Sequence, residues 1–307
     1  MKNLFAALEA GGTKMVCAIV AEDGEVVDKK TIPTTTVEET LNAITDYFRG
    51  QMSIHEIKAL GIGTFGPVEL HKESDEYGNI LNTPKAGWKG AKLLTTLKEN
   101  LGIPVFIDTD VNCSCLGETT FGKYSNCKNL VYITIGTGIG AGFLVEGNLV
   151  HGALHPETGH MLLSREREDS FKSVCPYHDN CFEGLASGPA IELRCGKKAE
   201  FVEESSPVWE REAFYIAQAL VNIIMTTSPE KIILGGGVMH KKFLYPMIRR
   251  NVIKLVGGYL NIKELENIDN YIVEPSLGEE QGILGATALI HMGHQRNADG
   301  ISTNTNP

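Results

Sequence analysis

Short apolar runs and longer stretches of helical spacing follow one another along the chain, and this pattern predicts an α/β fold. Short apolar runs that end at glycines or polar turns are typical of strands. Strands are predicted at 4–8, 15–21, 25–32, 57–63, 103–110 and, ending in three glycines, at 229–237. Helices are predicted at about 37–49, 91–101, 205–227 and within 276–292, with one more that begins near Asp110.

One sequence unit occurs twice. Residues 5–27, FAALEAGGTKMVCAIVAEDGEVV, and residues 129–150, NLVYITIGTGIGAGFLVEGNLV, both run strand, glycine-rich turn, strand, short turn, strand. Two copies of one unit suggest a duplicated, two-lobed fold in which each lobe contributes a phosphate-binding turn. Two ordinary hairpins with glycines at their bends are the alternative.

The composition limits the possible partners. Of the 307 residues, 42% are hydrophobic and 21% are charged, which favours a folded chain with a large core. The formal net charge of -10 offers no attraction for nucleic acid or an anionic membrane. No apolar run approaches the roughly 20 residues of a spanning helix, and the N-terminal stretch meets glycines too soon for a secretory signal. We therefore expect a cytoplasmic protein, with no nucleic-acid or membrane partner, whose seven cysteines form no disulfide framework.

Three glycine-rich turns follow apolar strands, at residues 11–14, 136–140 and 235–237. Glycine lets backbone N–H groups approach a phosphate, and threonine adds a hydroxyl donor. The sequence contains neither the P-loop pattern nor a clean dinucleotide-binding GxGxxG pattern, which disfavours those two nucleotide-binding folds. Three such turns, two of them in the repeated unit, indicate a nucleotide between two lobes.

Polar groups gather where the strand at 103–110 gives way to a helix. Asp108, Asp110 and Asn112 lie within five residues of one another. An Asp in front of a helix is most often a cap, but two acids and an amide favour contact with a ligand. In a kinase, one aspartate accepts the proton of the attacking sugar hydroxyl. Further groups suited to hydrogen bonds with a polyol are Glu157, His160 and Glu183.

The spacing of cysteines and histidines predicts a metal site. The loop Cys175-Pro-Tyr-His178-Asp-Asn-Cys181 places three soft ligands close together, and His160 lies upstream across a charged segment. Two thiolates and two imidazoles suit tetrahedral zinc with no position open for a substrate water, so the zinc would be structural and would hold the loop 161–174. His151 and His155 are alternative fourth ligands. A coincidental cluster in a surface loop is the alternative to a metal site.

The segment 136–160 resembles the signature of the repressor, open reading frame, kinase (ROK) family. The matching run is Gly136-Thr-Gly-Ile-Gly140-Ala-Gly142-Phe, then Gly152, then Pro156-Glu-Thr-Gly159-His160. EAGGTK at 9–14, DTDVN at 108–112 and LGGGV at 234–238 match other landmarks of the family in order, so that the resemblance covers about residues 4–290. Within the family, CPYHDNCFEGLASGP at 175–189 resembles the loop of bacterial fructokinases, whereas glucokinases and repressors usually carry a cysteine-only zinc loop.

The resemblance implies a two-lobed actin-like ATPase (ribonuclease H-like) fold with a duplicated core. The small lobe would span 1–116 and be completed by the C-terminal helix at about 281–292. The large lobe would span 117–280 with the zinc loop, and 293–307 would form a flexible tail. ATP would lie in the cleft with the sugar deeper between the lobes, and a homodimer is the favoured assembly.

Residue roles follow from the match of motifs. Asp110 would be the general base. Contacts with the sugar are implied for Asn82, Thr83, Pro84, Asn112, Glu157, His160 and Glu183, and zinc would be held by His160, Cys175, His178 and Cys181. Contacts with ATP are implied for Gly12, Thr13, Lys14, Thr137 and Gly138 near the phosphates and for Gly188, Pro189, Gly236, Gly237 and Val238 near the adenosine. Many relatives have Asp where this chain has Glu9, which moves the carboxylate at the metal–phosphate end by one methylene.

The reaction that the resemblance implies is ATP-dependent phosphorylation of D-fructose to fructose 6-phosphate, with Mg²⁺ as the metal of ATP and Zn²⁺ as a structural ion. A ROK hexokinase that prefers mannose or glucose is one alternative, because such a preference depends on one or two hydroxyl contacts. A sugar-binding sensor without catalysis is another. A sugar-responsive repressor is disfavoured, because the chain is acidic and starts directly at its first strand.

Overall fold

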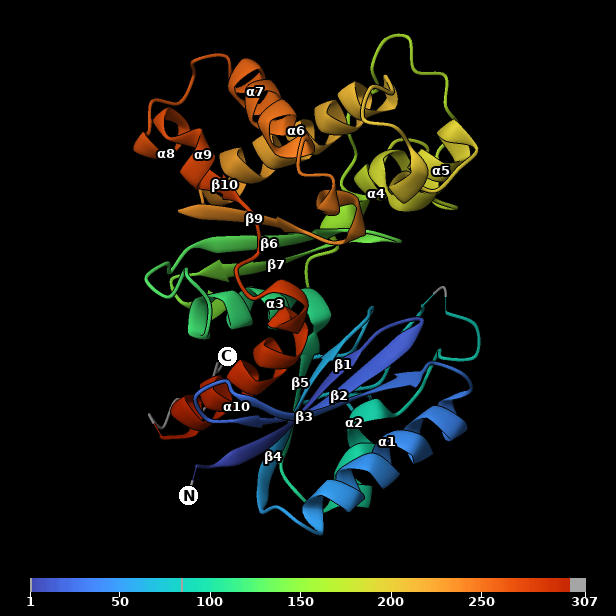
Figure 1. The fold of residues 1–307 in the computed structure, drawn as a ribbon, viewed down its shortest axis with the longest axis vertical. Coiled ribbons are helices and arrows are strands. Elements are labelled where there is room, and N and C mark those ends of the chain that lie inside the picture. Colours follow the sequence, from blue (N-terminus) through green and yellow to red (C-terminus); the bar gives the residue numbers. More distant parts are fainter. Residues whose placement is uncertain (1, 84, 299–307) are drawn as a thin grey trace. The chain divides into compact units, whose positions relative to one another are not determined.

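The computed structural model describes residues 2–83 and 85–298 of the chain. These residues form two compact units (Figure 1). Unit 1 contains the chain up to Asn126, the short segment His151–His155 and the chain from Ser276 onward, and unit 2 contains Cys127–Val150 and Pro156–Pro275. The lobe boundary near residue 116 that the resemblance implies stays a prediction.

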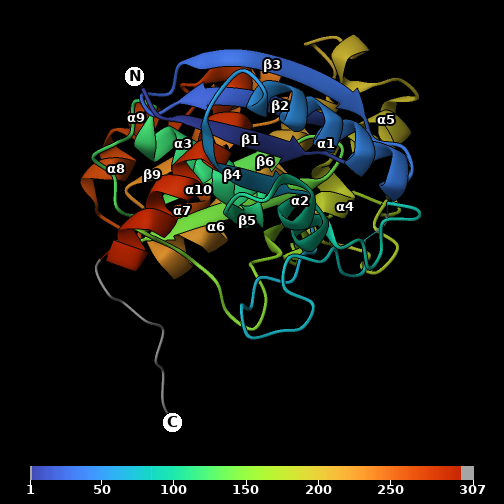
Figure 2. The ribbon, with the colours of Figure 1, turned by 90° about the horizontal axis from the view of Figure 1, so that it is seen from below.

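Unit 1 is built on a five-stranded sheet. Its strands are β1 (Leu4–Ala10), β2 (Lys14–Ala21), β3 (Val26–Pro33), β4 (Ile57–Thr64) and β5 (Val105–Thr109). They lie side by side in the order β3-β2-β1-β4-β5, as Figure 2 shows. The first three form an antiparallel meander in which Leu4 pairs with Ala21, and β4 and β5 continue the sheet in parallel with β1.

Helices cover both faces of this sheet. Successive strand residues point to opposite faces, so that Leu8 packs in the core under α1 (Val37–Met52) and α2 (Leu93–Leu101), while Phe5 packs with Ile290 of α10 (Gln281–Ala298). The predicted capping box is present, because the Thr36 side chain accepts a hydrogen bond from the Glu39 N–H at the start of α1. The helix predicted near Asp110 is α3 (Asp110–Thr120).

The last helix packs on α3 through glycines. A Cβ atom at Gly285 would lie 1.7 Å from the Cys113 carbonyl oxygen, and one at Gly117 would lie 2.7 Å from the Gln281 carbonyl oxygen. The buried Glu118 carboxylate also accepts hydrogen bonds from the backbone N–H groups of Ser276 and Leu277, at 2.8 and 3.2 Å. These contacts anchor the C-terminal segment within unit 1.

Unit 2 repeats the arrangement. Its strands are β6 (Leu130–Ile135), β7 (Ile139–Val145), β8 (Asn148–Leu149), β9 (Lys231–Gly235) and β10 (Ile272–Val273), in the order β10-β9-β6-β7-β8. Here too an antiparallel meander is extended by two parallel strands, with β9 beside the first strand of the meander. The same strand order in both units confirms the predicted duplication of the core.

Unit 2 contains several helices besides the one predicted from the sequence. The long α6 (Val208–Thr227) matches the prediction, whereas α4 (Phe182–Ala186), α5 (Gly188–Cys195), α7 (Leu244–Val256), α8 (Lys263–Glu266) and α9 (Ile268–Tyr271) were not anticipated. Single-turn 3₁₀ helices lie at η1 (Thr158–His160), η2 (Ala199–Phe201) and η3 (Gly237–His240), and η4 (Gly278–Glu280) leads into α10 of unit 1. The core of unit 2 joins α6 and α7 to its sheet through residues such as Trp209, Ile216 and Ile248.

The C-terminal part of the chain differs from the prediction. The final helix continues to Ala298, beyond the predicted end at 292 and into the predicted tail. The remainder of that tail, 299–307, lies outside the described residues. Within the described part of the chain, no helix is both long and apolar enough to span a bilayer.

Candidate active-site residues and candidate metal centre

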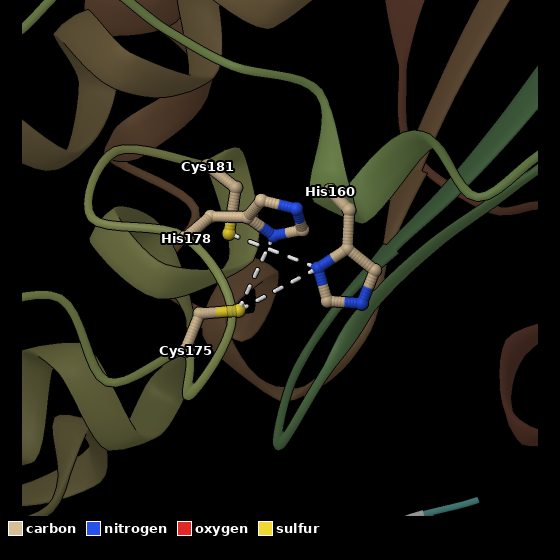
Figure 3. Close-up of side chains that lie close together, drawn as sticks. All are labelled: His160, Cys175, His178 and Cys181. Carbon is tan, nitrogen blue, oxygen red and sulfur yellow. Dashed lines mark hydrogen bonds between the residues drawn. The ribbon is translucent and has the colours of Figure 1, made fainter. Parts of the chain in front are cut away.

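The four predicted metal ligands lie together in unit 2 (Figure 3). The ligand atoms of His160, Cys175, His178 and Cys181 are all within 4.8 Å of one another. Cys175 Sγ lies 3.8 Å from His160 Nδ1 and 3.6 Å from His178 Nδ1, and Cys181 Sγ lies 3.8 Å from His160 Nδ1. Tetrahedral zinc bonds of about 2.3 Å to sulfur and about 2.0 Å to nitrogen would place those atoms about 3.6 Å apart. The donor set and its spacing therefore fit a tetrahedral metal ion.

The local fold brings these ligands together for identifiable reasons. Cys181 Sγ accepts the Gly184 N–H at 3.3 Å, so that this ligand also caps α4. A Cβ at Gly184 would lie 2.0 Å from Ser173 Oγ and 3.0 Å from Cys175 Cβ, and only glycine allows the ligand loop this close to the helix. Burial, together with the Cys175 thiol, raises the pKa of the Cys181 thiol to about 11. The thiolate form at neutral pH would thus need the charge of a bound cation.

The alternative histidine ligands have other partners. His151 and His155 belong to unit 1, where His151 Nε2 lies 2.8 Å from Asp108 Oδ2 and His155 Nε2 accepts the Val68 N–H at 3.2 Å. The described ligand cluster contains His160 and neither of these two residues.

A buried ion pair holds the loop that precedes the metal ligands. Asp169 receives both terminal nitrogens of the Arg194 guanidinium at 2.7 Å and the Tyr215 hydroxyl at 2.6 Å. Both charged side chains are more than nine-tenths buried. Although burial opposes it, the hydrogen bonds from Arg194 and Tyr215 hold the pKa of Asp169 well below its usual range.

Replacement of Asp169 by Asn should lower the free energy of unfolding by about 3–5 kcal/mol at pH 7, because Arg194 keeps a buried charge without its anion. The pKa of Asp169 is lower in the folded chain than in the unfolded chain, where it is 3.8. Its carboxylate therefore stabilises the fold above pH 3.8, and this stabilisation is lost as the pH falls below that value. Urea unfolding should therefore show a smaller gap between wild type and Asp169→Asn at pH 3 than at pH 7. Glu168→Gln, at an exposed neighbour, is the control, and a gap independent of pH would contradict this account.

The predicted nucleotide residues of unit 2 come from three segments that meet. Thr137 and Gly138 are exposed in the β6–β7 turn, and the Gly188 N–H at the start of α5 donates to the Gly136 carbonyl at 2.7 Å. Gly236, after β9, has φ +86°, and a Cβ there would lie about 2.5 Å from the backbone of Ile135. A Cβ at Gly136 would lie 3.7 Å from the Gly237 nitrogen. The remaining members of this set, Pro189 and Val238, follow directly in α5 and η3.

Glu183 contacts the same turn. Its Oε2 atom accepts the Ile139 N–H at 2.9 Å and lies 2.9 Å from the position that a Cβ at Gly138 would take. Desolvation and the negative charge of Glu183 raise the pKa of Glu157 above its ordinary value. The structure thus places both predicted sugar-contacting glutamates near each other and near the β6–β7 turn.

The corresponding turn of unit 1 joins β1 to β2. The Gly11 N–H donates to the Lys14 carbonyl at 3.0 Å, and Thr34 closes the turn by donating its hydroxyl to the Gly11 carbonyl at 2.8 Å and its N–H to the Thr13 carbonyl at 3.0 Å. Gly12, Thr13 and Lys14 are exposed. Thr34 was not predicted from the sequence, because it directly follows β3 and belongs to none of the recognised motifs.

The two aspartates at the end of β5 have different surroundings. Asp108 is buried, and its carboxylate accepts the Thr109 N–H at 2.8 Å and the Asn112 side-chain amide at 2.6 Å. Asp110 is partly exposed at the first position of α3, and its Oδ1 accepts the Val111 N–H at 2.8 Å. The helix cap is Thr109, whose side chain accepts the Asn112 N–H. Asp110 is therefore the more exposed carboxylate of this pair.

Two other predicted positions of unit 1 are less constrained. Asn82 is exposed and Thr83 is half-buried, with the Thr83 hydroxyl accepting the Lys85 N–H at 3.3 Å. Pro84 lies outside the described residues.

The Glu9 carboxyl packs against the first turn of α10, where a Cβ at Gly282 would lie 2.5 Å from Glu9 Cδ. Burial raises the pKa of Glu9, while Lys14 and Lys29 oppose this change.

A cavity of about 350 Å³ lies beside α5 and α6 in unit 2. Three cations line it, but each is paired with a carboxylate: Arg194 with Asp169, Arg211 with Glu166, and Lys197 with Glu203. The cavity therefore lacks the net positive charge that would favour an anionic ligand.

The fold and these motifs define a known class of protein. A model of the ROK family matches residues 5–292, and the chain belongs to this family. The chain is 48% identical over 296 residues to a protein named putative fructokinase from Bacillus subtilis, which covers 96% of this chain and 98% of that protein. It is 46% identical over 286 residues to a fructokinase from Pediococcus pentosaceus, which covers 93% of this chain and 97% of that protein.

Solved structures share the fold at lower identity. A ROK hexokinase from Thermus thermophilus superposes with a TM-score of 0.76 at 22% identity and covers 96% of this chain and 99% of that one. A ROK glucokinase from Streptomyces griseus, solved with glucose and AMPPNP, gives a TM-score of 0.72 at 24% identity and covers 94% and 99%. The actin-like ATPase fold with a duplicated core is confirmed.

Proposed function

We propose that this chain transfers the γ-phosphoryl group of ATP to the 6-hydroxyl of D-fructose, with Asp110 as the general base. The assignment of the base rests on one observation: Asp108 in β5 and Asp110 in α3 differ in their burial. Asp108 is buried, with one carboxylate oxygen bound by Thr109 and Asn112 and the other by His151, whereas Asp110 is partly exposed. A general base must reach the proton that it removes.

The relatives support fructose as the acceptor. Those named fructokinases are 38 to 48% identical to this chain over at least 91% of its length. Those named glucokinases are 26 to 28% identical. The chain is an enzyme of the fructokinase type within its family.

The proposed mechanism assigns a role to each group of residues. Asp110 orients the 6-hydroxyl and accepts its proton as the γ-phosphoryl group departs from ATP. Mg²⁺, bound with ATP, supplies charge neutralisation at the phosphates. The match of motifs assigns sugar contacts to Asn82, Thr83 and Asn112 in unit 1 and to Glu157, His160 and Glu183 in unit 2. It assigns phosphate contacts to the glycine-rich β1–β2 and β6–β7 turns, and adenosine contacts to residues of unit 2 alone.

The metal centre has a structural role in this proposal. Four protein ligands would complete a tetrahedron and would leave no open position, which is typical of structural rather than catalytic zinc. His160, Cys175, His178 and Cys181 would hold Zn²⁺ and fix the loop that leads to Glu183 in α4. We also propose a homodimer in the cytosol, a location that suits the seven free cysteines.

The test is ADP release from Mg²⁺-ATP with fructose, mannose, glucose and N-acetylated hexosamines as acceptors. We expect kcat/KM to be highest with fructose, and the 6-phosphate to be the product by NMR. Faster turnover with mannose or glucose would replace the proposed substrate and keep the mechanism. A folded, metal-loaded protein without turnover on any of these sugars would contradict the proposed enzyme and favour a sensor.

A further inference from the structure

His151 stands out because it connects a separate segment of the chain to the turn that carries the proposed general base. The segment His151–His155 lies between two parts of unit 2 in the sequence but belongs to unit 1. Two contacts hold its backbone and its end: His71 Nε2 lies 3.1 Å from the Ala153 carbonyl, and His155 Nε2 accepts the Val68 N–H. His151 differs from both, because it contacts a buried carboxylate at the end of β5.

The hydrogen bonds of Asp108 determine which atoms carry protons. His151 Nε2 lies 2.8 Å from Asp108 Oδ2, and Asn112 Nδ2 lies 2.6 Å from Asp108 Oδ1. A carboxylate only accepts hydrogen bonds, so Nε2 of His151 carries a proton and donates it to Asp108. The 3.5 Å between His151 Nε2 and Asn112 Nδ2 separates two donors that share one carboxylate and is not a hydrogen bond of its own.

This arrangement fixes the orientation of the Asn112 amide. Because its nitrogen faces Asp108, its oxygen Oδ1 points away from that carboxylate. Oδ1 is buried and has no hydrogen-bond partner among the described residues. Buried polar atoms are rarely left without a partner, so this oxygen calls for a donor such as a hydroxyl group of a ligand.

We propose that His151 is a positioning residue for the hexose: it holds the Asp108 carboxylate, which in turn orients the Asn112 amide toward a sugar hydroxyl. The inference rests on the proposed function, in which Asn112 contacts the sugar. The His151 side chain is about one-third exposed while Asp108 is buried, so the pair links the surface of unit 1 to the interior of the turn. Without the imidazole donor, Asp108 keeps a buried charge with one acceptor oxygen unsatisfied, and Asn112 loses its fixed orientation.

The test compares His151→Phe, which removes the donor and keeps a flat ring, with His151→Gln, which keeps an amide donor. The matched control is His71→Phe, which alters a histidine of the same neighbourhood that contacts a backbone carbonyl. We expect His151→Phe to raise the KM for fructose about 10- to 100-fold, as for a hydrogen bond to a charged group. The KM for ATP should change less than about twofold, and His151→Gln should recover most of the loss.

A double-mutant comparison checks that His151 acts through Asp108. On an Asp108→Asn background, His151→Phe should change the KM for fructose by less than about twofold, because the carboxylate that it holds is gone. Fructose affinity by calorimetry without ATP, and thermal melts of each variant, separate loss of binding from loss of fold. If His151→Phe fails to fold, His151→Ala takes its place in each comparison.

An unchanged KM for fructose in His151→Phe, or an equal rise in His71→Phe or His151→Gln, would overturn the inference. These outcomes are distinct from a failure of the proposed function, which the wild-type turnover on the sugar panel tests by itself. If wild type prefers another hexose, the same comparison is made with that sugar.

Discussion

Asp110→Asn should lower kcat for fructose phosphorylation by about 10²- to 10⁴-fold, the range for loss of a general base. The amide cannot accept the proton of the 6-hydroxyl, but it keeps the size and the hydrogen-bonding shape of the carboxylate. Fructose binding should therefore remain measurable by calorimetry. The substitution should also leave the thermal melt close to that of wild type, because Asp110 is partly exposed at the first position of α3.

The control for this prediction is Asp46→Asn, which removes one negative charge from an exposed position of α1 in the same unit. Its kcat should equal that of wild type. The companion variant Asp108→Asn should behave differently from Asp110→Asn, with a loss in fructose affinity rather than in kcat alone. Turnover by Asp110→Asn within about tenfold of wild type would remove Asp110 from the role of base.

Cys175→Ser should abolish metal binding and lower the thermal stability strongly. We expect wild type to carry about one zinc per chain by elemental analysis and the variant to carry almost none, because a serine hydroxyl is a poor ligand for this ion. The free energy of metal binding to such a site is also free energy of folding. Its loss should lower the melting temperature by at least about 10 °C, if several kcal/mol are removed from a chain of this size.

Cys127→Ser is the matched control for the metal prediction, since Cys127 is a half-buried cysteine of unit 2 that lies outside the ligand cluster. It should keep the zinc content of wild type. Treatment of wild type with a chelator should reproduce the lowered melting temperature, and added zinc should restore it. Wild type that is purified without metal and melts at the same temperature as Cys175→Ser would contradict the metal centre.

Much of the fold was predictable from local patterns. The strands of both meanders, α1, α6 and the start of α3 follow from apolar periodicity, caps and glycine turns, which are properties of neighbouring residues. Helix α7 also carries a local signal, because Leu244, Ile248, Val252 and Val256 recur at helical spacing and are all buried. Helices α4 and α5 are too short for such periodicity to reveal them.

The candidate site was predictable as a set of residues but not as a set of contacts. Spacing alone identified the two cysteines and the histidine of the metal loop and favoured His160 as the fourth ligand, but it left His151 and His155 as alternatives. The identity of the fourth ligand depends on which unit each histidine folds into. The structure places His160 beside the metal loop and places His151 and His155 in unit 1. Thr34 and Gly282, which support the β1–β2 turn and the Glu9 carboxyl, carried no local signal because their partners are distant in the sequence.

The sequence by itself determined the class of fold, the duplication, the glycine-rich turns and the residue types of the metal site, because each depends on residues close together in the chain. Only the tertiary structure decided which of two neighbouring aspartates is buried and which is exposed. It also decided the partner of His151, since a hydrogen bond between β5 and the segment after β8 requires the chain to fold back over 43 residues. Burial and long-range pairing depend on how distant segments pack, and no local pattern of residues contains that information.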